Sequence, residues 1–119
     1  MCTPRARQVM QMLGALFLQQ DMPERALALY GALDAEDPSS PEHLRGMVLS
    51  LSNMGRHEQA LSALDRLALA GGVDARFHLI RAHTLTHLQR PDEAAASMRA
   101  FMDLEGRSES GESAKREAP

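Results

Sequence analysis

The sequence of 119 residues is poor in aromatic side chains and in cysteine. Aromatic residues make up 3% of it and tryptophan is absent. This argues against a β-protein and against a binder of carbohydrates or nucleobases, because both rely on aromatic faces. Cys2 is the only cysteine, so no disulfide can form within the chain, and a reducing compartment is favoured. Its place near the terminus argues against a role as nucleophile.

Excess positive charge and long apolar runs are also missing. The formal net charge is −3, and basic residues never form a block, which disfavours nucleic-acid binding. No run approaches the roughly 18 consecutive apolar residues of a membrane-spanning helix, so we expect no membrane insertion. No early apolar segment is followed by a small-residue cleavage site, so we expect no signal peptide. A cytoplasmic protein fits these absences.

A short motif, in which alanine follows acidic or polar residues, occurs three times in the chain. Its alanines, Ala26, Ala60 and Ala94, are separated by 34 residues each time. A period of 34 residues in a helical pattern is typical of the tetratricopeptide repeat. We interpret the alanines as the positions where the two helices of each hairpin cross most closely, because a larger side chain would separate them.

The period predicts an all-α protein, with three helix-turn-helix repeats in a short right-handed superhelix. A leader at residues 1–6 precedes a single domain over 7–105. Residues 106–119 are polar, lack large apolar side chains, and predict a disordered tail. The three repeats, aligned on the alanines, are 7–40, 41–74 and 75–108.

Local signals mark where the expected helices begin and end. Asp21 and Asp74 are candidate N-caps, whose carboxylates can accept hydrogen bonds from the first turn of a helix. Gly55 suits the left-handed backbone that ends a helix. Pro91 is expected in the first turn of the last helix, and that helix is expected to fray after Leu104.

In a tetratricopeptide domain the first helices of the repeats line a concave groove. We expect the groove-facing residues one turn apart on each of these helices. Two methionines on the last helix are added as candidates, because methionine suits surfaces that adapt to a partner. The predicted partner-binding residues are Gln8, Gln11, Ala15, Leu18, Arg45, Leu49, Ser52, Arg76, Leu79, His83, Met98 and Met102.

Both ends of the predicted stack lack a covering helix. Val9, Met12 and Leu16 lie where a preceding helix would pack, and Met98 and Met102 are followed only by the polar tail. Exposed apolar surface marks an interface, and three repeats are near the lower limit for an independent stack. We therefore expect a chain that is marginally stable alone and is stabilised by a helix-forming partner.

Patterns typical of catalysis or cofactor binding are missing. His83 and His87 are four residues apart, a spacing that can hold a metal, but a third ligand and an H-E-x-x-H pattern are lacking. Gly71 and Gly72 are not followed by the Lys and Ser/Thr of a phosphate-binding loop. We expect no enzyme activity, no bound metal and no cofactor.

The segment Leu18-Gln19-Gln20, leading into Glu24-Arg25-Ala26-Leu27 and Ala32-Leu33, carries a further resemblance. In so short a chain of three repeats it is similar to the YscY-type chaperones of bacterial type III secretion systems, over residues 9–104. The resemblance implies a chaperone of the bacterial cytoplasm that binds a YscX-type secreted component 1:1. It also implies delivery to the cytosolic ring of the major export-gate protein, at the inner membrane. The alternative is a general tetratricopeptide scaffold for another envelope or secretion complex.

Overall fold

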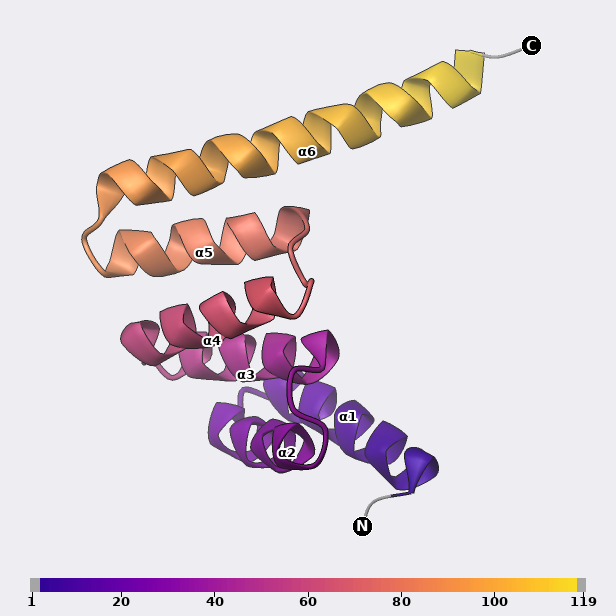
Figure 1. Ribbon diagram of the computed structural model, residues 1–119, viewed down its shortest axis with the longest axis vertical. Helices are drawn as coiled ribbons and strands as arrows, with labels where there is room; N and C mark the ends of the chain where they lie inside the picture. Colours follow the sequence, from indigo (N-terminus) through magenta and orange to yellow (C-terminus); the bar gives the residue numbers. More distant parts are fainter. Residues whose placement is uncertain (1–2, 118–119) are drawn as a thin grey trace. The chain divides into compact units, whose positions relative to one another are not determined.

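The computed structural model describes the backbone of residues 3–117 and the side chains of residues 3–107. Within this range it contains six α-helices and no strand (Figure 1). The all-α class predicted from the 34-residue period is confirmed. The helices are α1 (Pro4–Gln19), α2 (Pro23–Glu36), α3 (Pro41–Asn53), α4 (His57–Leu69), α5 (Ala75–His87) and α6 (Pro91–Glu117).

The chain divides into two compact units, Met1–Gly72 and Val73–Pro119. The first unit holds α1 to α4, and each helix packs on the next one along the chain; α3 also packs on α1. The second unit is the hairpin of α5 and α6. The single domain over residues 7–105 stays a prediction.

The recurring alanines lie in the core of each hairpin. Ala26 and Ala60 are 0% exposed, and Ala94 is 7% exposed. In the first unit they are accompanied by leucines and a valine that are also fully buried, which is the burial expected of amphipathic helices that pack through one face. These core residues are Leu33, Leu44, Val48, Leu64 and Leu67.

Tyr30 on α2 holds the first three helices together. Its ring packs where α1 and α3 have glycine: a Cβ atom at Gly14 would lie 2.7 Å from Tyr30 Cζ, and one at Gly46 would lie 2.4 Å from Tyr30 Cδ1. The hydroxyl donates a long hydrogen bond of 3.5 Å to the backbone oxygen of Gln11. Burial raises the pKa of Tyr30 above its ordinary value, because the charged phenolate would lose solvation.

Several predicted helix limits are confirmed and one cap is wrong. Asp74 Oδ1 accepts a hydrogen bond of 2.8 Å from the backbone nitrogen of Phe77, and Gly55 has the expected positive φ of 75°. Asp21 does not cap α2: its own φ is 59°, and Met22 stands at the cap without a side-chain hydrogen bond. The turn geometry, rather than a carboxylate, therefore ends α1 and starts α2.

The start of α1 falls within residues 1–6, the segment predicted as a leader. The helix begins at Pro4, because the side chain of Thr3 accepts a hydrogen bond of 3.0 Å from the backbone nitrogen of Ala6. Such a cap satisfies one of the free N–H groups of the first turn. The helix thus includes residues that the sequence analysis places in the leader at 1–6.

Helix α6 is longer than expected and continues past Leu104 to Glu117. The predicted helix end is therefore corrected. The sequence after Gly106 lacks large apolar side chains, and helices without packing partners are marginal in water, so disorder of this segment in solution stays a prediction. Residues 118 and 119 lie outside the described part. Over residues 3–117, no helix combines the length and apolar character needed to cross a membrane.

Candidate protein-binding surfaces

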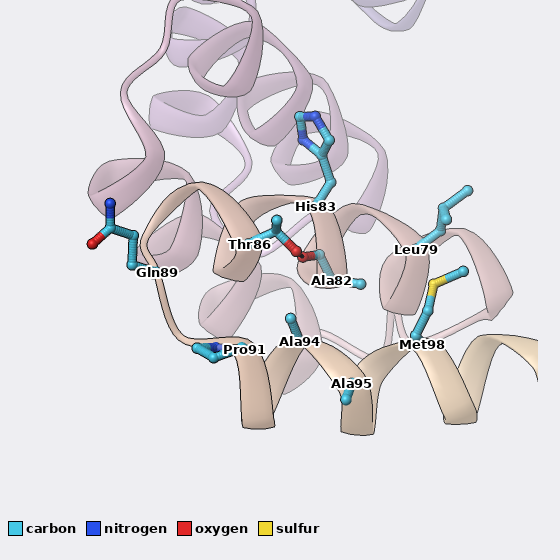
Figure 2. A pocket seen from close by; sticks show the side chains of 9 residues that line it. All are labelled: Leu79, Ala82, His83, Thr86, Gln89, Pro91, Ala94, Ala95 and Met98. Carbon is cyan, nitrogen blue, oxygen red and sulfur yellow. Dashed lines mark hydrogen bonds between the residues drawn. The ribbon is translucent and has the colours of Figure 1, made fainter.

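The hairpin of α5 and α6 carries an open groove of about 640 Å³ (Figure 2). We call it the α5–α6 groove. Its walls are mostly apolar, with alanines at the base and Leu79 and Met98 at one end, where Figure 2 shows the two side chains beside each other. The groove is lined by Leu79, Ala82, His83 and Thr86 of α5, Gln89 of the turn, and Pro91, Ala94, Ala95 and Met98 of α6.

Every residue of the α5–α6 groove lies two 34-residue periods after a residue of the first hairpin. Leu79 corresponds to Gln11, and Met98 corresponds to Tyr30. The backbones also match, because Asp21 and the corresponding Gln89 share an unusual positive φ of 59° and 58°. The two hairpins can therefore be compared residue by residue.

In the first hairpin the corresponding slot is occupied by α3. The ring of Tyr30 packs against Gly46. The side-chain nitrogen of Gln11 donates a hydrogen bond of 3.2 Å to Glu42 Oε2 and lies 2.8 Å from His43 Nε2. The first hairpin binds a helix at these positions, and the α5–α6 hairpin leaves the corresponding positions open. The shape of the α5–α6 groove is therefore suited to a helix.

A second apolar surface lies on α1. We call Val9, Met12, Leu13 and Leu16 the α1 outer face; these residues are 50%, 68%, 40% and 46% exposed. They border a shallow hollow of about 490 Å³. The predicted exposure of the apolar residues at this end of the repeat stack is confirmed.

The structure brings together only part of the predicted binding set. Leu79, His83 and Met98 line the α5–α6 groove. Gln11 is instead a packing residue between α1 and α3, and Leu18 packs against the cluster around Tyr30.

The other predicted residues line no common hollow with these three. Arg45 donates a hydrogen bond of 3.4 Å to the backbone oxygen of Gly72. Ala15 borders the hollow on α1, and Met102 is 56% exposed on α6. Gln8 and Arg76 are exposed, while Leu49 and Ser52 are half-buried. Their part in binding stays a prediction.

The predicted binding set omits six residues of the groove, Ala82, Thr86, Gln89, Pro91, Ala94 and Ala95. Apart from two methionines, the predicted set came from residues one turn apart on the first helix of each repeat, whereas the groove also takes in other residues of α5, the turn and the second helix. The signal that could have found them was present, because Pro91 and Ala94 repeat Pro23 and Ala26 at the same spacing.

His83 and His87 lie beside each other on α5. His83 Nε2 and His87 Nε2 are 3.2 Å apart, and both side chains are exposed. Over the described residues, no group of three or more His, Cys, Asp and Glu side chains is placed to hold a metal ion. The α5–α6 groove therefore presents mainly apolar contacts and shape.

The chain belongs to the tetratricopeptide repeat family, whose sequence profile matches residues 17–84. Proteins of this fold are typically scaffolds for protein interactions rather than enzymes. No curated protein matches the chain.

Solved structures show the same fold at low identity. The solved structure of MamA MSR-1 has 19% sequence identity to this chain and a TM-score of 0.76. The match covers 89% of this chain and 61% of the MamA chain. MamA AMB-1 is 18% identical with a TM-score of 0.75, covering 87% and 57%. The TPR domain of Arabidopsis FLU is 18% identical with a TM-score of 0.73, covering 87% and 95%. The chain thus spans less than two thirds of the MamA chains.

Proposed function

We propose that this chain is a chaperone that holds a helix of a small secreted protein in its α5–α6 groove. The carrying observation is the correspondence of this groove to the slot that α3 fills in the first hairpin. The class of partner follows the resemblance to YscY-type chaperones, so the ligand is a YscX-type component of a type III secretion system. The chain would act in the bacterial cytoplasm.

The mechanism is binding alone. A partner helix lays its apolar side over Leu79, Ala94 and Met98, as helix-in-groove ligands do. Its apolar surface stays covered until the cytosolic ring of the export gate competes for it. A ligand that binds only the folded chain stabilises it by about 2.7 kcal/mol at a concentration 100 times its Kd.

A pull-down from the native host, followed by mass spectrometry, tests the proposal. We expect one small secreted protein to co-purify 1:1 and to raise the melting temperature of the chain. Leu79→Glu should abolish the complex, because a bound partner helix would cover this exposed side chain and an unpaired charge there would lose solvation. Leu69→Glu is the matched control, since Leu69 is 91% exposed and lies outside the groove. A sharp, high-temperature transition that no partner shifts would refute the proposal.

The same groove also suits a general tetratricopeptide scaffold for another envelope or secretion complex. The gene neighbourhood separates the two functions, because only the chaperone should lie among type III secretion genes. The pull-down separates them as well: a scaffold would retain components of an assembled complex instead of one export substrate. An enzyme or metal protein would need the histidine pair, so a metal titration that shows binding would favour it. His87 lies outside the groove lining, so His87→Ala should leave the affinity for a helical partner unchanged.

A further inference from the structure

The α1 outer face matches the side of α3 that is buried in the first unit. Its residues lie one 34-residue period before residues of α3. The α3 residues are buried, with His43 2% and Ser50 0% exposed, whereas their counterparts on α1 are about half exposed. The corresponding pairs are Val9 with His43, Met12 with Gly46, and Leu16 with Ser50.

The chain therefore carries both halves of its own repeat-to-repeat interface in open form. The α5–α6 groove is the counterpart of the slot that receives α3, and the α1 outer face is the counterpart of the α3 surface that enters it. Placing α1 of one copy in the α5–α6 groove of another repeats the contact already present between the first hairpin and α3.

The polarity of the two halves agrees. In the contact within the chain, Gln11 lies beside His43, and both are polar. The corresponding pair between copies is Leu79 with Val9, which are 41% and 50% exposed. A polar pair is replaced by an apolar pair, so neither side would bury an unpaired polar group.

The sizes agree as well. Within the chain a large ring, Tyr30, meets a residue without a side chain, Gly46. Between copies the corresponding pair is Met98 with Met12, so one ring is replaced by two flexible side chains with the same total number of heavy atoms. Methionine adapts readily to irregular space, and the residues are 36% and 68% exposed.

Charges at one end of the contact are opposite in sign. The first turns of α1 carry Arg5 and Arg7 and no acidic residue. Within the chain, the start of α3 comes shortly after the end of α2. Two 34-residue periods later, the positions at the end of α2 correspond to residues of α6 that include Asp103 and Glu105, with Arg107 close by. An excess of acidic groups would thus face the two arginines.

We infer that the protein associates with itself head to tail, with the α1 outer face of one copy in the α5–α6 groove of the next. Such a contact is heterologous and leaves a free half at each end, so it extends with concentration. The proposal goes beyond the proposed function and does not depend on the secreted partner. Where that partner is present, it competes with α1 for the same groove.

Sedimentation velocity of the full chain over a range of concentrations tests the inference. We expect the average mass of the unmodified chain to rise with concentration. Met12→Glu and Leu79→Glu should each weaken association by about tenfold or more, because each places a charge in the contact. Circular dichroism checks that both variants fold. Met12→Gln and Leu79→Gln replace them if they do not, and Leu69→Glu is the control that should behave like the unmodified chain.

Mixing the two variants gives the decisive result. Met12→Glu keeps an intact groove and Leu79→Glu keeps an intact α1 outer face, so the mixture should form a 1:1 pair and nothing larger. A symmetric contact between two α1 helices would instead be lost in Met12→Glu alone and would overturn the inference. A chain that stays monomeric at all concentrations, or a mixture that forms no pair, would also overturn it; binding of a secreted partner to such a monomer would leave the proposed function intact.

Discussion

Replacing Gly46 with alanine tests the contact that organises the first unit. A Cβ atom at this position would lie 2.4 Å from Cδ1 and Cε1 of Tyr30 and 2.5 Å from Cζ. The ring cannot move away freely, because Gly14 of α1 approaches its other edge, where a Cβ atom would lie 2.8 Å from Tyr30 Cε2. The added methyl group must therefore push α3 and α2 apart.

The two contributions to the free energy of unfolding have opposite signs. Alanine improves helix propensity over glycine by about 1 kcal/mol, while overpacking a filled core costs about 1–3 kcal/mol. Because several distances from the added Cβ atom to Tyr30 are much shorter than a normal van der Waals contact, we expect a net loss of about 1–2 kcal/mol for Gly46→Ala. Gly31→Ala in α2 is the matched control, because nothing lies within 4 Å of its Cβ position. It should gain up to about 1 kcal/mol.

Urea unfolding, followed by circular dichroism and by the fluorescence of the only tyrosine, measures both changes. The unfolding midpoint should fall for Gly46→Ala and rise for Gly31→Ala. In a chain with Tyr30→Leu, the cost of Gly46→Ala should shrink, because the clashing ring is gone; this double-mutant cycle isolates the contact. If Gly46→Ala is as stable as Gly31→Ala, Tyr30 does not fill the space between α1 and α3.

Three further predictions concern the repeat spacing, the buried tyrosine and a helix cap. Ala60→Leu, at a position that is 0% exposed, should lower the free energy of unfolding by about 1–3 kcal/mol; an unchanged urea midpoint would contradict the assigned spacing. The pKa of Tyr30 should lie above its ordinary value in the folded chain and return to about 10 in urea. As the pH rises, Tyr30 therefore loses its proton in the unfolded chain before it does so in the folded chain. The contribution of Tyr30 to stability should be complete below about pH 10 and decline as the pH rises toward the pKa of the folded state. Equal tyrosinate titrations of the folded and unfolded chains would refute this. Asp74→Ala should cost about 1 kcal/mol in thermal unfolding, whereas Asp74→Asn should keep most of the cap, and equal losses for both would show that the hydrogen bond to Phe77 is not what stabilises α5.

Features that depend on a few neighbouring residues could be predicted from the sequence. The helix start at Pro91, the cap at Asp74 and the left-handed turn at Gly55 are all confirmed. Each depends on the conformational limits of proline and glycine or on a side chain that reaches its own first turn. The predicted cap at Asp21 is wrong because Asp21 itself adopts a positive φ of 59° in the turn. The neighbouring sequence does not require that conformation, so it could not be predicted.

The candidate site could be predicted only in part. The repeat spacing identified Leu79 and His83 as groove-facing, and Met98 was predicted because methionine suits adaptable surfaces. The spacing could not separate Gln11 from Leu79, which has the same place in the repeat, because the packing of Gln11 depends on α3 lying against it. Whether a groove position is filled or open is decided by another part of the chain.

The sequence by itself determined the class of protein: a 34-residue spacing of three alanines in a helical pattern indicates helical hairpins, since hairpins need a small residue where their helices cross. The tertiary structure decided which surfaces are left uncovered. Tyr30 closes the first slot by packing on Gly46 of a third helix, whereas the α5–α6 hairpin holds no third helix that would cover the corresponding Met98. That distinction depends on contacts between residues far apart in sequence, and these contacts exist only when the helices are packed.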